Sequence, residues 1–403
     1  MKECIYCRKT KNKSDFSLEH IIPYSLGGSQ LPDNLKSYDV CQRCNNILGL
    51  FVDGAFEKNF FVHNFLIECD LALLNQSKYY AEPLSCLGKS KLSPPEIKEE
   101  EICEYWIGTL GLGVFWIRPD DSRFEAYCGG DPIKVKSKKI DTRAYFVLPH
   151  SYSESSDNAN KLLMTIKEAF RDKPVKKVLC HDFDKESDAA YVLLEQLGFS
   201  EPDQLDEKRK NYFHSIVKNG EIENNLQHDL YHDKRFLAKV SIGISHCLFG
   251  DKILNTESIN KLYKVLWDRD NSEDAELLYN NTFLCNRTFY YSHYSLEYLL
   301  GVPYAVTISI IPDNQYIIIN INIKQELNYV VGCAKINDIT QKELESITNN
   351  GGEVFVIYKK IDKCIHLYFN DFILHQNGSK INPQIDSIQQ RINENNYTSD
   401  KKP

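Results

Sequence analysis

The sequence predicts an α+β protein, with a small cysteine-stapled unit at the N-terminus and a large mixed α/β region with a β-rich C-terminal part. Two Cys-x-x-Cys pairs lie within the first 46 residues, a spacing typical of a metal-stapled unit. Apolar runs of strand length and of helix length then alternate along the chain. For 403 residues, two or three domains are expected. We place them at 1–87 and 102–403, separated by a polar stretch, and leave open a further division near residue 225.

Four cysteines are expected to bind a structural zinc ion. Cys4 and Cys7 form the first pair, and Cys41 and Cys44 form the second. Four thiolates in two such pairs suit tetrahedral Zn²⁺, whereas the alternative is four buried thiols in an ordinary core. Polar residues beside the pairs are unlike those of core strands, so we favour zinc. The other nine cysteines show no metal spacing and are expected to be free thiols in a reducing cytoplasm.

The 33 residues between the two pairs are long enough to carry structure of their own. We expect one strand over 16–22, ended by Pro23, and a second strand over 35–40. Gly27-Gly28 is expected to turn the chain sharply or to let its backbone approach a ligand. A helix should begin at the second cysteine pair and place Asn45 in its first turn. The prediction is a strand–strand–helix unit stapled by zinc at its base.

Several short motifs follow one another in order within this unit. They are Cys4, Cys7, Glu19-His20-Ile21-Ile22-Pro23, Gly27-Gly28, Asn34-Leu35, Cys41, Cys44 and Asn45. This order resembles the HNH endonuclease family with its ββα-metal (His-Me) finger, over about residues 1–55. Asn45 stands where many members have histidine, as it does in zinc-knuckle members that include phage junction-resolving nucleases. Glu19 stands where many members have aspartate.

The residue types suit hydrolysis of a phosphodiester bond. His20, when neutral, can accept a proton from water. Glu19 and Asn45 offer oxygen ligands for a catalytic Mg²⁺ or Mn²⁺. Neighbouring residues of a regular strand point to opposite sides, so the motif implies a bulge or a strand end near Glu19. The resemblance implies that Asn34 fixes the loop that orients His20.

Each of these residues also has a simpler interpretation, because short motifs match by chance. Glu19 would then be a surface carboxylate, Asn34 a turn cap and Asn45 an ordinary residue of a helix start. For Asn34 alone, the simpler interpretation is favoured. The ordered set within a zinc frame favours the nuclease.

Charge and hydropathy restrict the function further. The net charge of −8 argues against nucleic-acid binding by the whole surface. The first 50 residues carry a small excess of basic side chains, which allows contacts with phosphates. No secretory signal is expected at the N-terminus, so we expect a cytoplasmic protein. The longest apolar stretch, 304–323, is interrupted by Pro312-Asp313-Asn314 and is expected to form a hairpin and not a membrane span.

The remaining chain shows strand and helix patterns that carry no second catalytic motif. Strands are expected over 113–117, 143–148, 175–180, 304–311, 315–323, 353–359 and 364–374, and helices over 158–170, 187–197 and 234–249. The stretch 88–101 is expected to be a linker, and the chain is expected to fray from about Arg391.

These observations predict a metal-dependent HNH endonuclease that hydrolyses DNA and serves as a regulated bacterial defence effector. The alternatives are an HNH effector subunit of a short Argonaute-type complex, and a non-catalytic, zinc-stabilised nucleic-acid-binding protein. We expect the C-terminal region to mediate homo-oligomerisation or to bind a partner protein, and we expect no membrane association. The target, the DNA-versus-RNA preference, the activating signal and the oligomeric state are not indicated by the sequence.

Overall fold

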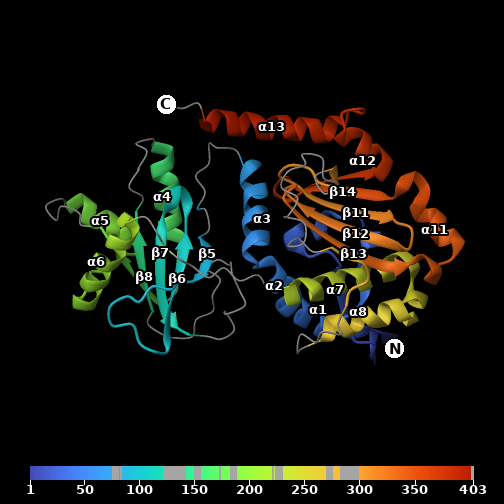
Figure 1. Cartoon of the computed structure of the whole chain (residues 1–403), viewed down its shortest axis with the longest axis horizontal. Helices are drawn as coiled ribbons and strands as arrows, with labels where there is room; N and C mark the ends of the chain where they lie inside the picture. The colour runs from blue at the N-terminus through green and yellow to red at the C-terminus, as the bar shows by residue number, and fades with distance from the viewer. Residues whose placement is uncertain are drawn as a thin grey trace. The chain divides into compact units, whose positions relative to one another are not determined.

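The helices and strands of the computed structural model form two compact units, shown in Figure 1. The structure describes residues 1–74, 81, 84–120, 142–148, 156–171, 174–181, 188–219, 222, 230–268, 276–281 and 299–400. The first unit joins residues 1–57, 64–75 and 229–403, and the second joins 58–63 and 76–228. The domain boundaries expected from the sequence divide the chain along other lines, and the division of roles that they imply stays a prediction.

Residues 1–57, called the finger below, contain the expected strand–strand–helix order. β3 pairs antiparallel with β4, and α1 begins directly after β4. The elements are β1 (Lys2–Glu3), β2 (Thr10–Lys11), η1 (Lys13–Asp15), β3 (Phe16–His20), η2 (Tyr24–Leu26), η3 (Gly28–Gln30), η4 (Asp33–Leu35), β4 (Lys36–Cys41), α1 (Gln42–Leu48), the π turn η5 (Gly49–Asp53) and α2 (Gly54–Glu57). The predicted strand–strand–helix unit is therefore confirmed.

Two glycines turn the chain back after β3. Gly27 has φ of +83°, a left-handed conformation that residues with a side chain rarely adopt. At Gly28, a Cβ atom would lie 1.7 Å from the carbonyl oxygen of Ile22. Of the two roles expected for this loop, the structure shows the sharp turn.

The first unit is built on a six-stranded antiparallel sheet in the order β10-β13-β12-β11-β14-β15. One face packs against α7, and residues of α12 and α13 form a hydrophobic cluster with β14 on the other. β11 and β12 form the hairpin expected over 304–323. The elements are α7 (Leu230–Phe249), η9 (Asp251–Asn255), α8 (Glu257–Trp267), β10 (Asn280–Asn281), β11 (Val306–Pro312), β12 (Tyr316–Ile323), β13 (Leu327–Lys335), η11 (Ile336–Asp338), α11 (Gln341–Thr348), η12 (Asn349–Gly351), β14 (Glu353–Tyr358), η13 (Lys359–Ile361), β15 (Lys363–Tyr368), α12 (Phe369–Gln376) and α13 (Pro383–Asp400).

The finger packs directly on α7. A Cβ atom at Gly243 would lie 2.5 Å from Cγ2 of the buried Ile21, so glycine allows β3 and the helix to approach closely. Phe56 stacks on Phe236 of α7 with ring centroids 3.8 Å apart, and its edge meets Tyr329 of β13. The finger therefore shares a hydrophobic core with α7 and β13, which lie far along the chain.

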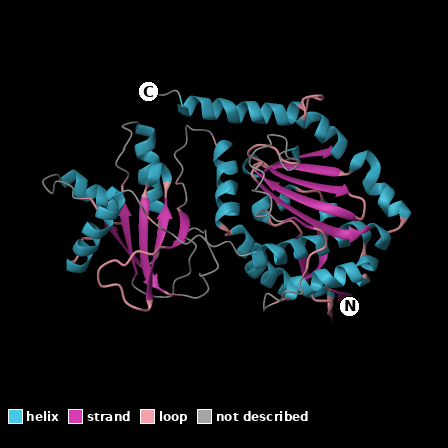
Figure 2. Cartoon of the chain, viewed as in Figure 1, coloured by secondary structure: helices cyan, strands magenta, loops and turns pink. Residues whose placement is uncertain are grey.

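The second unit is built on a five-stranded sheet in the order β5-β6-β7-β8-β9, in which only β8 and β9 are parallel among the described strands. Figure 2 shows helices on both sides of this sheet: α4 packs on one face and α6 on the other. The elements are β5 (Ser85–Lys89), β6 (Glu101–Ile107), η6 (Thr109–Gly111), β7 (Gly113–Pro119), β8 (Thr142–Val147), α4 (Ser156–Glu168), β9 (Val175–Leu179), α5 (Asp188–Gln196) and α6 (Gln204–Asn219). Helix α3 (Phe60–Ala72) contributes residues to both units.

Three local expectations are wrong. The stretch 88–101 is not a linker between domains, because it joins β5 to its neighbour β6 within one sheet. The strand expected over 364–374 ends at Tyr368, where α12 begins. The chain continues beyond Arg391 as α13, which extends to Asp400, since side chains such as Ile392 are buried against the sheet.

No helix in the described part of the chain is long and apolar enough to cross a membrane.

Candidate functional site

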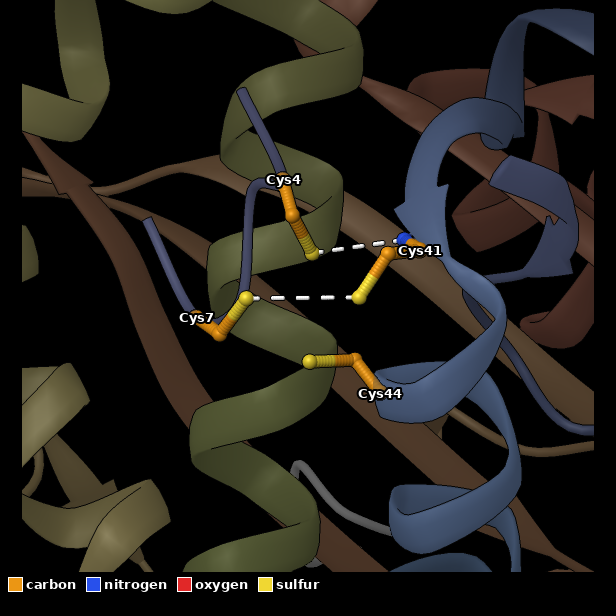
Figure 3. A group of neighbouring side chains, drawn as sticks. All are labelled: Cys4, Cys7, Cys41 and Cys44. Atoms are coloured by element: carbon orange, nitrogen blue, oxygen red, sulfur yellow. Dashed lines mark hydrogen bonds between the residues drawn. The ribbon is translucent and has the colours of Figure 1, made fainter. Parts of the chain in front are cut away.

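The four cysteine side chains of the finger converge on one point (Figure 3). Their sulfur atoms all lie within 4.8 Å of one another, and Sγ of Cys7 lies 4.0 Å from Sγ of Cys41. Tetrahedral zinc with Zn–S bonds of about 2.3 Å would place the sulfurs roughly 3.8 Å apart. Within the described residues, this is the one group of three or more Cys, His, Asp or Glu side chains that could hold a metal. The donor set and its spacing fit a structural zinc site.

The surroundings of the cluster favour a thiolate at Cys4, whereas burial raises the pKa of Cys7 and the hydrogen bond with Cys4 raises the pKa of Cys44. A hydrogen bond with Cys44 lowers the pKa of the Cys4 thiol to about 4, despite the opposing effect of burial. The backbone N–H of Cys41 donates to Cys4 Sγ over 3.3 Å. Lys11 Nζ donates to Cys41 Sγ over 3.0 Å, and this positive charge offsets part of the negative charge of four thiolates around zinc. Lys11 thus supports the metal cluster.

A bulge interrupts the β3–β4 pairing at the predicted position. Ser17 pairs with Val40, but the next aligned pair is Glu19 with Ser37, so one residue of β3 faces two of β4. The extra residue makes β4 the bulged strand, and β3 itself ends at His20, one residue after Glu19. The expectation of a bulge or strand end near Glu19 is confirmed.

Glu19 lies at the end of β3 with its side chain only 5 % exposed. Its Oε1 atom is 2.6 Å from Nζ of Lys239 on α7. Burial raises the pKa of Glu19, and the ammonium of Lys239 opposes this rise. The simpler interpretation, a surface carboxylate, is therefore wrong for Glu19.

His20 is the last residue of β3 and is partly exposed. Burial lowers its pKa, and the positive charges of Lys36 and Lys239 lower it further. His20 is therefore mainly neutral near pH 7, which is the form that can accept a proton.

Asn45 ties α1 to β3. Its Nδ2 atom donates to Ser17 Oγ over 3.0 Å and to the Leu18 carbonyl over 2.9 Å. These two bonds orient the amide, and they leave Oδ1 as a donor atom for a hard cation.

Asn34 has an exposed position in η4. Its side chain makes no recorded hydrogen bond with the described residues, so the structure provides no contact through which it would orient His20. Its expected role stays a prediction without structural support.

One charged residue next to Glu19, Lys239, was missed by sequence reasoning. Lys239 is buried in the middle of α7, and Asp53 at the end of the π turn lies 2.6 Å from the same Nζ atom through Oδ2. The available signal was a lysine inside a helical run whose neighbours Phe236, Leu237, Ala238 and Val240 are all apolar. A lysine is rarely fully buried unless it is paired.

The catalytic divalent metal ion implied by the resemblance would need oxygen ligands. The ion pair with Lys239 engages Oε1 of Glu19, and the hydrogen bonds of Asn45 engage its Nδ2. One carboxylate oxygen and one amide oxygen therefore stay suited to Mg²⁺ or Mn²⁺ by their chemistry. Both side chains start from the same end of the finger, because Asn45 is bonded to the two residues before Glu19.

Comparison with protein families gives a match over residues 4–61 to the model described as HNH endonuclease. The match spans all four cysteines together with Glu19, His20, Asn34 and Asn45. No curated protein and no solved structure matches the chain.

Proposed function

We propose that the protein is a metal-dependent endonuclease that hydrolyses phosphodiester bonds in DNA. The match of residues 4–61 to HNH endonucleases, with the four-thiol cluster at its centre, carries this proposal. Glu19 and His20 lie at the end of β3, and Asn45 of α1 donates to the residues just before them, so the acid, the base and the amide come from adjoining segments.

In the proposed reaction, His20 takes a proton from the water that attacks phosphorus. The lowered pKa of His20 keeps its imidazole neutral and ready for that step. Glu19 and Asn45 would hold Mg²⁺ or Mn²⁺. A divalent ion, when bound, stabilises negative charge on the phosphate and on the leaving 3′ oxygen. Asn45 also fixes the position of β3 relative to α1 through its two donated hydrogen bonds.

Cleavage of supercoiled plasmid by the full chain tests the proposal, with and without Mg²⁺ or Mn²⁺. His20→Ala should lower the rate by about 10²- to 10⁴-fold, the usual contribution of a general base. Zinc content and folding should be unchanged, because the side chain is partly exposed and forms no hydrogen bond with another residue that the structure describes. His366→Ala is a matched control, since His366 stacks on Phe355 outside the finger. Wild-type cleavage by His20→Ala would refute the assignment of the base.

A non-catalytic, zinc-stabilised nucleic-acid-binding module is the second candidate. The observation in its favour is the ion pair between Glu19 and Lys239, which engages an oxygen of the expected metal ligand. This candidate predicts DNA binding without cleavage at any divalent metal concentration, so the plasmid assay separates the two.

Breaks in both DNA strands require two cuts, and the finger offers one proposed site per chain. We therefore propose that duplex breaks need two copies of the chain, or a partner protein that binds the C-terminal region. Nicked circles formed before linear DNA at low protein concentration would support this, together with sedimentation of the full chain. The role in bacterial defence and the alternative in an Argonaute-type complex stay predictions from the resemblance.

A further inference from the structure

Lys239 of α7 places a positive charge beside two carboxylates of the finger. Its side chain is 1 % exposed, and its Nζ atom lies 2.6 Å from Glu19 Oε1 and 2.6 Å from Asp53 Oδ2. The two carboxylates come from different segments of the finger, β3 and the π turn after α1. One ammonium thus bridges two acidic side chains.

Glu19, Asp53 and Lys239, called the charged cluster below, contain two acidic side chains and one basic side chain. Burial alone would lower the pKa of Lys239, but the charges of Asp53 and Glu19 outweigh it and raise the pKa. Burial raises the pKa of both carboxyls, and the ammonium of Lys239 opposes the rise. Among the described residues, Oδ1 of Asp53 and the hydroxyl of Tyr6 are both buried without a hydrogen-bond partner. The pKa of Tyr6 is raised by burial and by the carboxylates of Glu19 and Asp53. When both carboxyls are ionised, the charged cluster has a net negative charge, and a negative charge attracts a cation.

The ion pair with Lys239 fixes the side chain of Glu19, which is a candidate metal ligand. Glu19 directly follows the point where two residues of β4 face one of β3, and it lies one residue before the end of β3, so the strand pairing alone does not fix its side chain. The carboxylate instead points toward Lys239, on a helix that is packed against the finger through Ile21 and Gly243. Lys239 lies outside residues 4–61, the part that matches the HNH model.

We propose that Lys239 is a positioning residue for the proposed nuclease site. Its ammonium holds Glu19 at the end of β3 with one oxygen available to a metal ion, so that α7 completes a site whose other members lie in the finger. The inference rests on the proposed function of the finger.

Lys239→Met in the full chain tests the proposal with two measurements. Cleavage should fall by about 10²-fold, the effect of a misplaced catalytic group. Mn²⁺ binding without DNA, followed by electron paramagnetic resonance, should instead become tighter by on the order of tenfold, because the place between two carboxylates loses its positive charge. Unchanged cleavage with unchanged Mn²⁺ affinity would overturn the proposal. A rise in both would also overturn it, since Lys239 would then restrain the site.

Lys239→Met leaves the buried carboxylates of Glu19 and Asp53 without their counter-charge, and this could prevent folding. A second comparison avoids that problem. Asp53→Asn removes one of the two carboxylates, and Lys239→Met in that background should still lower cleavage at least about tenfold relative to Asp53→Asn alone. Equal rates of the single and double variants would overturn the proposal. Zinc content and hydrogen exchange of α7 report whether each variant is folded.

Lys324→Met is the matched control. Lys324 forms an ion pair with Glu68 in the same unit, so the variant loses the same charge at a site away from the charged cluster. Its cleavage and Mn²⁺ affinity should equal those of the wild type. If Lys239→Met is active while His20→Ala is inactive, the positioning role fails and the nuclease stands. If both are fully active, the proposed function itself fails.

Discussion

The contact between Ile21 of the finger and Gly243 of α7 can be tested by a pair of complementary substitutions. A Cβ atom at Gly243 would lie 2.5 Å from Cγ2 and 2.7 Å from Cδ1 of Ile21. Ile21→Ala removes both of these carbons. The methyl group of Gly243→Ala would then occupy space that the smaller side chain has vacated, and its remaining close contact would be the hydroxyl of Tyr6 at 2.9 Å.

The two single variants should each lower the free energy of unfolding. Ile21 is fully buried, and the loss of three carbons at about 0.8 kcal/mol each, with a cavity left behind, amounts to about 3 kcal/mol. Gly243→Ala forces an overpacked contact that costs about 1–3 kcal/mol. Because alanine favours the helix by about 1 kcal/mol over glycine, the net loss should be about 1 kcal/mol.

The double variant should be more stable than the sum of the singles predicts. Additive effects would lower the free energy of unfolding by about 4 kcal/mol, whereas relief of the overlap should leave a loss of about 2 kcal/mol. The difference is a coupling of about 2 kcal/mol, within the range for residues in contact. Urea unfolding should be followed by hydrogen exchange of peptides from residues 230–249, because a signal from the whole chain would mix two compact units.

Additivity within about 0.5 kcal/mol would refute the reasoning. It would mean that the finger and α7 do not pack as a single core, and the proposed action of Lys239 on Glu19 would lose its structural basis. Ile22→Ala is a control, since Ile22 is equally buried and is not among the atoms nearest to Gly243. Its effect should add to that of Gly243→Ala.

Two further predictions concern protons and zinc. The neutral form of His20 is the active base, so the cleavage rate should rise with pH through a midpoint below 6.5, the ordinary histidine pKa, because burial, Lys36 and Lys239 lower the pKa. Lys36→Met should move this midpoint upward in a single-turnover pH profile, and an unchanged or lower midpoint would contradict the assignment. The purified chain should contain one zinc ion, and Cys44→Ser should lose it and open the finger to hydrogen exchange, since structural zinc contributes about 10–16 kcal/mol in zinc-finger peptides. Elemental analysis that finds no zinc in folded, active protein would contradict the zinc site.

Local sequence patterns were sufficient to predict those features that depend on residues close together in the chain. Cysteine spacing predicted the four-thiol cluster, because a Cys-x-x-Cys turn places two sulfurs on one side. Apolar periodicity predicted most strands and helices, including the β11–β12 hairpin and the helix that carries Asn45. The end of the chain was misjudged because α13 is polar along most of its length. A few buried side chains fix it to the sheet, and no sequence window shows that.

The tertiary structure decided which groups surround the proposed catalytic residues. Lys239 and Asp53 are 186 residues apart in the chain, so no spacing rule relates them. Their contact depends on α7 packing against the finger, where Gly243 allows the close approach. A buried charge is tolerated only with a partner, and the sequence shows a lysine in an apolar helix without showing that partner. Cysteine spacing and the order of the short motifs were enough to predict the four-thiol finger and its candidate acid, base and amide. The ion pair between the acid and Lys239 of α7 depends on the fold, because long-range packing brings those charges together.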